Sequence, residues 1–159
     1  MKSLSPLVLA ATTLGLSMPA VGQDLSATAT YETVTLQTGF TPDPYEVSVI
    51  SGGEVDASDL GDTCDGFIAD APDVKLHYET GKGSDFPLYI YAVSASDTTL
   101  VVNGPDGSWY CDDDSGGDAD PMVWFQDPQS GDYDIWLGSY EEGDNEDATL
   151  FISEISEDD

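Results

Sequence analysis

The segment Thr98-Thr-Leu-Val-Val-Asn-Gly-Pro-Asp-Gly107 (TTLVVNGPDG) carries the clearest fold signal in the chain. Most of its first six residues are β-branched or apolar, and together they have the length of a strand. The four residues that follow place proline where a turn needs φ of about −65° and glycine where φ can become positive. The segment therefore predicts a strand that ends in a tight hairpin turn.

Segments of the same kind recur on both sides of this one, separated by stretches rich in Asp, Gly and Pro. Apolar and polar residues alternate most regularly in 45–51 and 74–79. No window has the periodicity of an amphipathic helix, so helices are expected to be absent or limited to a single turn, at 57–61. The pattern indicates an all-β antiparallel sandwich or barrel. The other expected strands are 33–36, 66–68, 88–93, 108–110, 122–126, 133–138 and 148–153.

The first 22 residues have the pattern of a secretory signal peptide. Lys2 gives a positive start, an apolar run extends from Leu4 to Met18, and Ala20 and Gly22 occupy the −3 and −1 positions of a cleavage site. The run is too short and too mildly apolar for a stable membrane span, although an uncleaved anchor is the alternative. We expect a periplasmic or secreted product with a disordered or extended N-terminus (23–30), one domain (31–153) and an acidic tail (154–159).

The composition is strongly acidic, with 32 Asp and Glu residues against three Lys and Arg and a formal net charge of −29. Such a surface repels nucleic acid and anionic lipid, and it attracts cations or a basic protein patch. Adaptation to saline surroundings is an alternative explanation for the overall charge, but it does not explain local clusters. The hydrophobic content of 40% suffices for a folded core despite this charge.

The chain contains two cysteines, Cys64 and Cys111. An even number of cysteines in an exported protein predicts a disulfide. On the chain-entropy estimate, closing the loop between them would stabilise the fold by about 3–4 kcal/mol. A zinc site is disfavoured, because it would need His77 and a carboxylate in addition to the two thiols.

The sequence Cys111-Asp-Asp-Asp-Ser-Gly-Gly-Asp-Ala-Asp-Pro121 places five carboxylates between two expected strands. Oxygen donors at alternate positions around a central glycine can fold about one ion, and hard oxygen ligands favour Ca²⁺ over zinc or copper. The sequence does not match an EF-hand loop, and a solvated acidic hairpin is the alternative. The candidate metal ligands are Asp112, Asp113, Asp114, Asp118 and Asp120. The carboxylates Asp62, Asp65 and Asp70 would join this site if the disulfide brought their loop close.

A second acidic stretch, residues 141–147, is expected to form a flexible turn. The alternative is weak calcium binding by two or more such loops, because millimolar affinity is enough for an exported protein.

Catalytic motifs are absent from the sequence. His77 is the single histidine, and alternation places it with Lys75 on the outward side of its strand. The chain has no Gly-x-Ser-x-Gly elbow, no phosphate-binding glycine loop and no arginine. Acidic residues are so numerous that the spacing of any one pair cannot identify a glycosidase. We therefore expect a non-catalytic protein, with a hydrolase as a remote alternative.

Trp124 and Trp136 are candidate ligand-binding residues. If the residues on either side of each tryptophan face the core, both indoles point outward and could stack on a sugar. In the opposite register both are core residues. A carbohydrate-binding module is therefore the main alternative to a binding or stabilising module that uses calcium.

Three segments taken in order resemble the bacterial pre-peptidase C-terminal domain: 97–107 (DTTLVVNGPDG), 109–114 (WYCDDD) and 128–140 (PQSGDYDIWLGSY). In that family a D-T-x-L-x-V strand leads into a P-D-G turn, an acidic segment and an S-G-x-Y-x-I-x-V strand. The likeness covers about 86–153 well and 31–80 loosely. It implies a jelly-roll-like β-sandwich, similar to carbohydrate-binding modules, that usually accompanies a secreted peptidase. No enzyme is attached in this chain, so the resemblance leaves the role of the module open.

Overall fold

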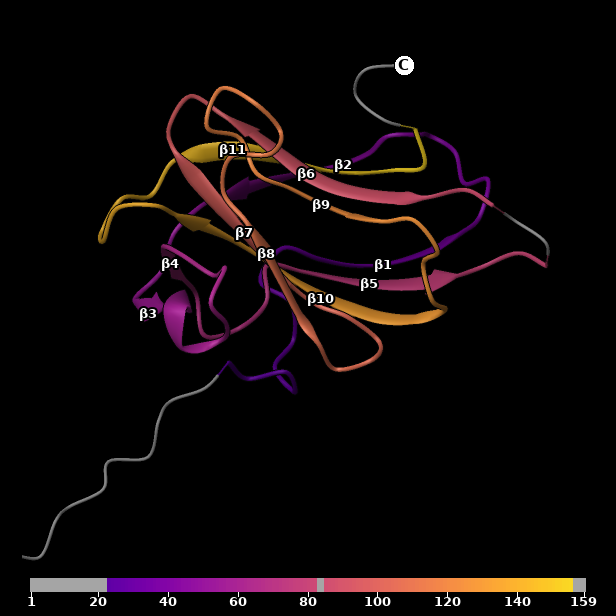
Figure 1. The fold of residues 1–159 in the computed structure, drawn as a ribbon, viewed down its shortest axis with the longest axis horizontal. Helices are drawn as coiled ribbons and strands as arrows, with labels where there is room; N and C mark the ends of the chain where they lie inside the picture. Colours follow the sequence, from indigo (N-terminus) through magenta and orange to yellow (C-terminus); the bar gives the residue numbers. More distant parts are fainter. Residues whose placement is uncertain (1–22, 83–84, 156–159) are drawn as a thin grey trace, which may run out of the picture.

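Two β-sheets pack face to face in the computed structural model, which describes residues 23–82 and 85–155 (Figure 1). The expected signal peptide, 1–22, lies outside these residues. The larger sheet contains β1 (Glu32–Gln37), β3 (Val55–Asp56), β4 (Phe67–Ile68), β5 (Val74–Glu79), β7 (Thr98–Asn103), β8 (Trp109–Asp112) and β10 (Gly131–Ser139). The smaller sheet contains β2 (Tyr45–Ile50), β6 (Leu88–Ser94), β9 (Met122–Phe125) and β11 (Asp147–Ser153). This arrangement confirms the predicted β-sandwich.

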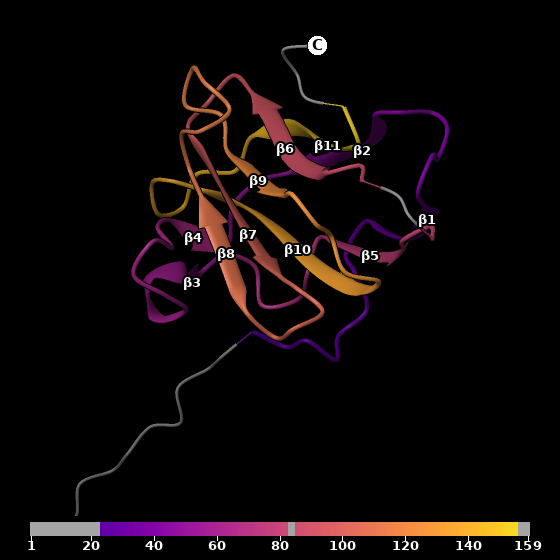
Figure 2. The ribbon, with the colours of Figure 1, turned by 45° about the vertical axis from the view of Figure 1, so that its right-hand side comes forward.

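Strand β10 organises the larger sheet. It pairs with β5 on one side and with β7 on the other, and β8 extends the sheet beyond β7 (Figure 2). The short strand β4 pairs with the end of β10 and carries β3. Strand β1 runs parallel to β5, whereas the other pairs of strands in the described residues are antiparallel, as expected. Parallel pairing requires a long crossover connection. The connection from β1 to β5 provides one, because it passes through β2 in the other sheet.

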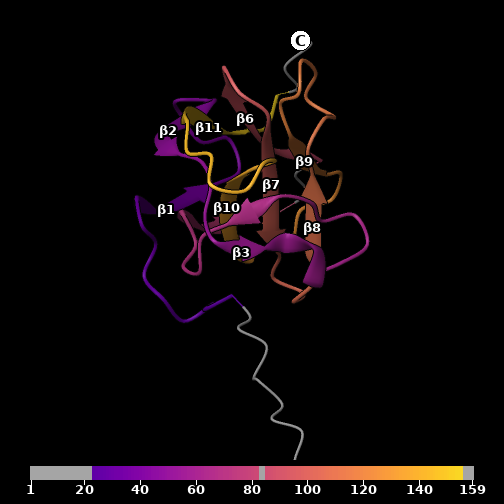
Figure 3. The ribbon, with the colours of Figure 1, turned by 90° about the vertical axis from the view of Figure 1, so that its left-hand side faces the viewer.

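The smaller sheet has the antiparallel order β2-β11-β6-β9. Figure 3 shows β9 at the same side of the sandwich as β8. Both are terminal strands of their sheets, because among the described residues β8 pairs with β7 alone and β9 with β6 alone. One side of the sandwich is therefore bounded by two strand edges that lack a neighbouring strand.

The main core fills the space between the sheets and follows the alternation seen in the sequence. Val74, Leu76 and Tyr78 are fully buried in it, while His77 points outward with 45% of its side chain exposed. The turn after β7 is also as predicted, with Gly107 at a φ of 78°. Local pattern therefore positioned the strands of the main core correctly.

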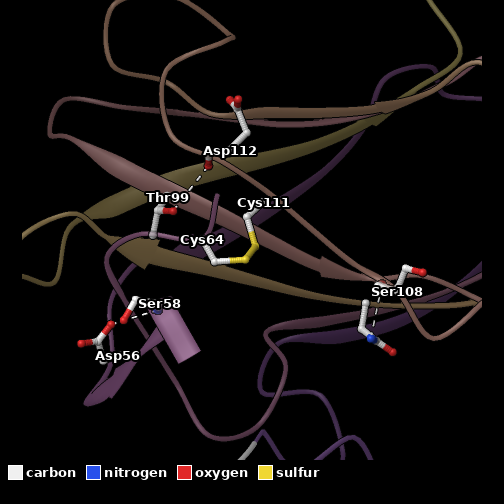
Figure 4. The surroundings of a disulfide bond; sticks show 8 residues. Asp56, Ser58, Cys64, Thr99, Ser108, Cys111 and Asp112 are labelled. Atoms are coloured by element: carbon white, nitrogen blue, oxygen red, sulfur yellow. Dashed lines mark hydrogen bonds between the residues drawn. A yellow bond between two sulfur atoms is a disulfide. The ribbon is translucent and has the colours of Figure 1, made fainter. Parts of the chain in front are cut away.

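A second, smaller core covers the outer face of the larger sheet. Trp136 and Val101 lie on that face and are fully buried beneath β3, β4 and the 3₁₀ turn η1 (Ala57–Asp59), which falls within the predicted helical turn. Gly138 permits this close packing, because a Cβ atom there would lie 2.5 Å from the Phe67 carbonyl oxygen. The predicted disulfide between Cys64 and Cys111 fastens this layer to β8 (Figure 4).

Both ends of the described chain are hydrogen-bonded to the sandwich. Asp24 N–H donates to the Asp70 carbonyl, and Lys75 Nζ donates to the Leu25 carbonyl at 2.7 Å. At the other end, Glu154 is buried and accepts from Tyr78 Oη at 2.6 Å. Glu154, the first residue of the expected acidic tail, is therefore held against the sandwich, and residues 156–159 of that tail lie outside the described residues. No helix in the described part of the chain is long and apolar enough to cross a membrane.

Candidate binding site

The acidic loop, residues 112–120, begins with a carboxylate that has a local structural role. In β8, Cys111 and Asp112 point in opposite directions, the cysteine towards the second core (Figure 4). Asp112 Oδ2 accepts from Ser115 N–H at 2.8 Å and from Met122 N–H at 2.9 Å, and Oδ1 accepts from Ser115 Oγ. Both carboxylate oxygens of Asp112 are therefore engaged in closing the base of the loop.

The tip of the acidic loop is a two-residue turn. Asp120 N–H donates to the Gly117 carbonyl at 2.9 Å, and the two residues between them, Asp118 and Ala119, have φ values of 53° and 65°. Two positive φ angles in succession are typical of a type I′ hairpin turn. Asp120 Oδ1 also accepts from Ser94 N–H at 3.0 Å, which ties the loop to the end of β6.

Two further carboxylates of the loop, Asp113 and Asp114, interact electrostatically with acidic residues from other parts of the chain. Burial raises the pKa of Asp113, and the charges of Asp114, Asp112 and Asp65 raise it further. Burial likewise raises the pKa of Asp97, with added effects of Asp114 and Glu141. We call Asp65, Asp97, Asp113, Asp114 and Glu141 the acidic corner. These side chains come from four separate loops at one end of the sandwich.

The acidic corner differs from the metal site expected from the sequence. Asp113, Asp114 and Asp65 were anticipated there, whereas Asp97 and Glu141 were not. Asp70 lines a different pocket, beside β3, together with Asp56 and Asp59. Among the described residues, no three or more His, Cys, Asp or Glu side chains are arranged so that they could hold a metal ion. Calcium binding therefore stays a hypothesis.

The two candidate tryptophans occupy different environments. Both indoles point outward from the main core, because their strand neighbours Val123, Ile135 and Leu137 are buried in it. Trp124 is 52% exposed and stacks on Tyr89 across β6 and β9, with ring centroids 6.2 Å apart and planes 17° apart. Trp136 is fully buried in the second core. The prediction that Trp136 could bind a ligand is wrong, because β3 and β4 cover it.

A groove lies between the two free strand edges, and we call it the edge groove. It has a volume of about 320 Å³. Trp109 and Tyr110 of β8 line one wall, and Met122 and Trp124 of β9 line the other. Asp112 and Ser115, at the start of the acidic loop, also line it. The edge groove thus combines aromatic walls with a location next to the acidic corner.

His77 lies on the flat outer face of the larger sheet. Its Nδ1 atom is 2.6 Å from Asp132 Oδ1 and its Nε2 atom is 3.9 Å from Glu79 Oε1. Both carboxylates are more exposed than the imidazole itself. This is an outward-facing cluster, as the alternation predicted.

Asp73 is a buried acid that the sequence analysis did not single out. Only 3% of it is exposed, and its Oδ2 atom accepts from Leu137 N–H at 2.8 Å. Burial raises the pKa of Asp73 to about 7, although the hydrogen bond from Leu137 opposes the shift. The sequence offered one signal, the position of Asp73 directly before the buried strand β5. This residue supports the fold between β5 and β10 and does not line the edge groove.

No family model and no curated protein matches the chain. One solved structure that matches is Aeromonas hydrophila PliG, a periplasmic lysozyme inhibitor of g-type lysozyme. The chain is 15% identical to PliG, and the alignment covers 77% of this chain and 96% of that chain with a TM-score of 0.39. At this TM-score the match carries no argument about function, and the resemblance to the pre-peptidase C-terminal domain stays a hypothesis.

Proposed function

We propose that this protein is an exported, non-catalytic binding module whose partner is a basic protein. The observation that carries the proposal is the acidic corner, where carboxylates from four loops are electrostatically coupled. The charges of Asp114 and Asp65 raise the pKa of Asp113, and those of Asp114 and Glu141 raise the pKa of Asp97. Ion pairs in the described part of the chain join Lys75 to Asp134, and His77 to Asp132 and Glu79. All of these lie on β5 and β10, so they leave the acidic corner without a cationic side chain.

Like charges held together in this way favour a cationic partner for two reasons. They concentrate the negative potential of a chain that already carries a net charge of −29, which speeds the approach of a basic surface. Lysine or arginine placed among the carboxylates would also relieve their mutual repulsion. The signal-peptide pattern of residues 1–22 supports an exported location, periplasmic or secreted, where such partners are encountered.

A second candidate function is carbohydrate binding. The exposed indole of Trp124 and the nearly parallel ring of Tyr89 favour it, because flat aromatic surfaces stack on sugar rings. The buried Trp136 cannot extend this surface. Calcium binding by the acidic loop is compatible with either function, and its test is described in the Discussion.

The experiment is a binding titration of the exported protein against basic and acidic proteins of similar size, at low and at high salt. A g-type lysozyme, the enzyme that PliG inhibits, is one of the proteins tested. We expect saturable binding to at least one basic protein, weakened by salt because exposed charges are screened. Absence of saturable binding to every basic protein would contradict the proposal.

A charge-matched pair of variants tests the role of the acidic corner. Asp113→Asn with Asp114→Asn should weaken binding. The control, Glu46→Gln with Glu54→Gln, removes the same charge from two exposed positions outside the corner and should change binding little. Equal weakening by both double variants would show that net charge alone matters, and the acidic corner would lose its proposed role.

A further inference from the structure

We infer that the edge groove is the docking site for an extended, lysine- or arginine-bearing segment of the partner. This inference rests on the proposed function and assigns the binding site within it. Three features carry the inference: the free strand edges, the aromatic walls and the adjoining carboxylates.

The two sides of the sandwich are closed by different kinds of contact. On the side of β1 and β2, Tyr45 Oη donates to Glu32 Oε1 at 2.6 Å, and Ile50 N–H donates to Tyr31 Oη at 3.0 Å. Tyrosine side chains therefore bridge the two sheets there and satisfy an edge amide. On the side of β8 and β9, the sheets are joined by the bond from Met122 N–H to Asp112, at the end of the groove, and by the edge-to-face contact of Tyr110 with Phe125.

Free strand edges can accept an added strand. Terminal strands present backbone N–H and C=O groups that pair with an extended segment, and natural proteins usually block such edges. Strands β8 and β9 have four residues each, so they would hold only a short segment. The groove volume of about 320 Å³ falls at the low end of typical ligand pockets, which agrees with a few side chains rather than a folded domain.

The walls of the groove suit a long cationic side chain. Trp124 is 52% exposed, so its indole offers apolar surface and a π-face to a bound lysine or arginine. Trp109 also lines the groove, but it is half-buried because its ring packs on Trp136 of the second core, with the ring centroids 5.5 Å apart. Tryptophan is also enriched at the hot spots of protein interfaces, where a few residues supply most of the binding energy. Trp124 is therefore expected to supply most of the affinity in the groove.

Charge distinguishes a cationic segment from a neutral sugar. The strand that forms one wall, β8, runs directly into Asp113 and Asp114 of the acidic corner. A segment lying along β8 would bring its basic residues to these carboxylates while its other side chains contact Trp109 and Trp124. A sugar could use the indoles but would leave the carboxylates unneutralised, so the arrangement as a whole favours the peptide.

The test uses a short synthetic peptide of alternating lysine and valine, which favours an extended conformation, and a glutamate–valine peptide as the charge control. Binding is followed by calorimetry and by amide chemical shifts in nuclear magnetic resonance. We expect the lysine peptide alone to bind, with the largest shifts at residues 109–112 and 122–125. Trp124→Ala should weaken binding about tenfold, the loss expected of a central interface residue. The matched control, Ile50→Ala, removes a 49% exposed side chain from the opposite edge and should bind normally.

The outcomes separate the site from the proposed function. If a basic protein binds but Trp124→Ala has no effect and the shifts lie elsewhere, the docking site is wrong and the proposed function stands. If neither the lysine peptide nor any basic protein binds, the proposed function fails as well. If neutral oligosaccharides shift the groove amides in place of the peptide, the groove is a sugar site and the inference is overturned.

Discussion

Leu137 N–H donates a hydrogen bond to Asp73 Oδ2 at 2.8 Å, so a carboxyl group at the start of β5 lies inside the larger sheet against β10. Both residues are buried, and burial raises the pKa of Asp73 from 3.8 to about 7. The folded protein therefore holds the Asp73 proton more tightly than the unfolded chain does. This difference couples the stability of the fold to pH.

The first prediction concerns that coupling. Between pH 4 and pH 7 the folded state retains the Asp73 proton and the unfolded state releases it, so the stability contributed by Asp73 is present at pH 4 and is lost as the pH rises to 7. The loss is of the order of a few kcal/mol. Asp73→Asn, which can still accept from Leu137 N–H, should match the wild type at pH 4 and exceed it at pH 8. Urea unfolding of both proteins across this range measures the difference, and parallel curves would contradict the assignment.

The second prediction concerns the Cys64–Cys111 disulfide, which fastens the second core to β8. Reduction should lower the free energy of unfolding by about 3–4 kcal/mol on the chain-entropy estimate. It should also shift the fluorescence of the buried Trp136 to longer wavelength as its cover loosens. Denaturant titrations with and without reductant measure both effects. The double variant Cys64→Ser/Cys111→Ser is the control and should not respond to reductant, whereas free thiols in the untreated wild-type protein would refute the bond.

The two tryptophans show what the sequence could and could not predict. Alternation around Trp124 and Trp136 left two registers open, because side chains on successive strand residues point to opposite faces. The structure selects the register in which both indoles point away from the main core. Alternation could not reveal that the outer face at Trp136 is covered, because the cover consists of two-residue strands, β3 and β4, whose local signal is weak. That layer is held by contacts distant in sequence, including the disulfide.

The acidic corner illustrates the same limit for the candidate site. The cluster within residues 112–120 was visible, but the sequence could not show that Asp112 is occupied by Ser115 and Met122, since short-range donors compete for such carboxylates. Asp97 and Glu141 join Asp114 only through the packing of separate loops. Residue spacing predicts which carboxylates are neighbours along the chain, and tertiary structure decides which ones face one another.

The third prediction uses the turn at the tip of the acidic loop. Ala119 has a φ of 65°, a conformation that costs an L-residue about 1–2 kcal/mol and glycine almost nothing. Glycine relieves this strain but loses more backbone entropy on folding than alanine does. Ala119→Gly should therefore stabilise the protein by about 0.5–1 kcal/mol, the difference between the two effects. Ala95→Gly, at an exposed turn position without a positive φ, is the matched control and should destabilise slightly. Thermal unfolding of the two variants measures the contrast, and equal destabilisation would argue against strain at Ala119.

The fourth prediction tests calcium at the acidic corner. Asp114 contributes to the raised pKa of both Asp97 and Asp113, so it occupies the centre of the repulsion that a divalent cation would relieve. Millimolar Ca²⁺ should raise the melting temperature by a few degrees, because an ion that binds only the folded state stabilises it by mass action. Asp114→Ala should abolish the rise. Sodium chloride at equal ionic strength separates binding from screening: if it raises the melting temperature as much as Ca²⁺ does, the carboxylates respond to salt in general and the calcium hypothesis is wrong.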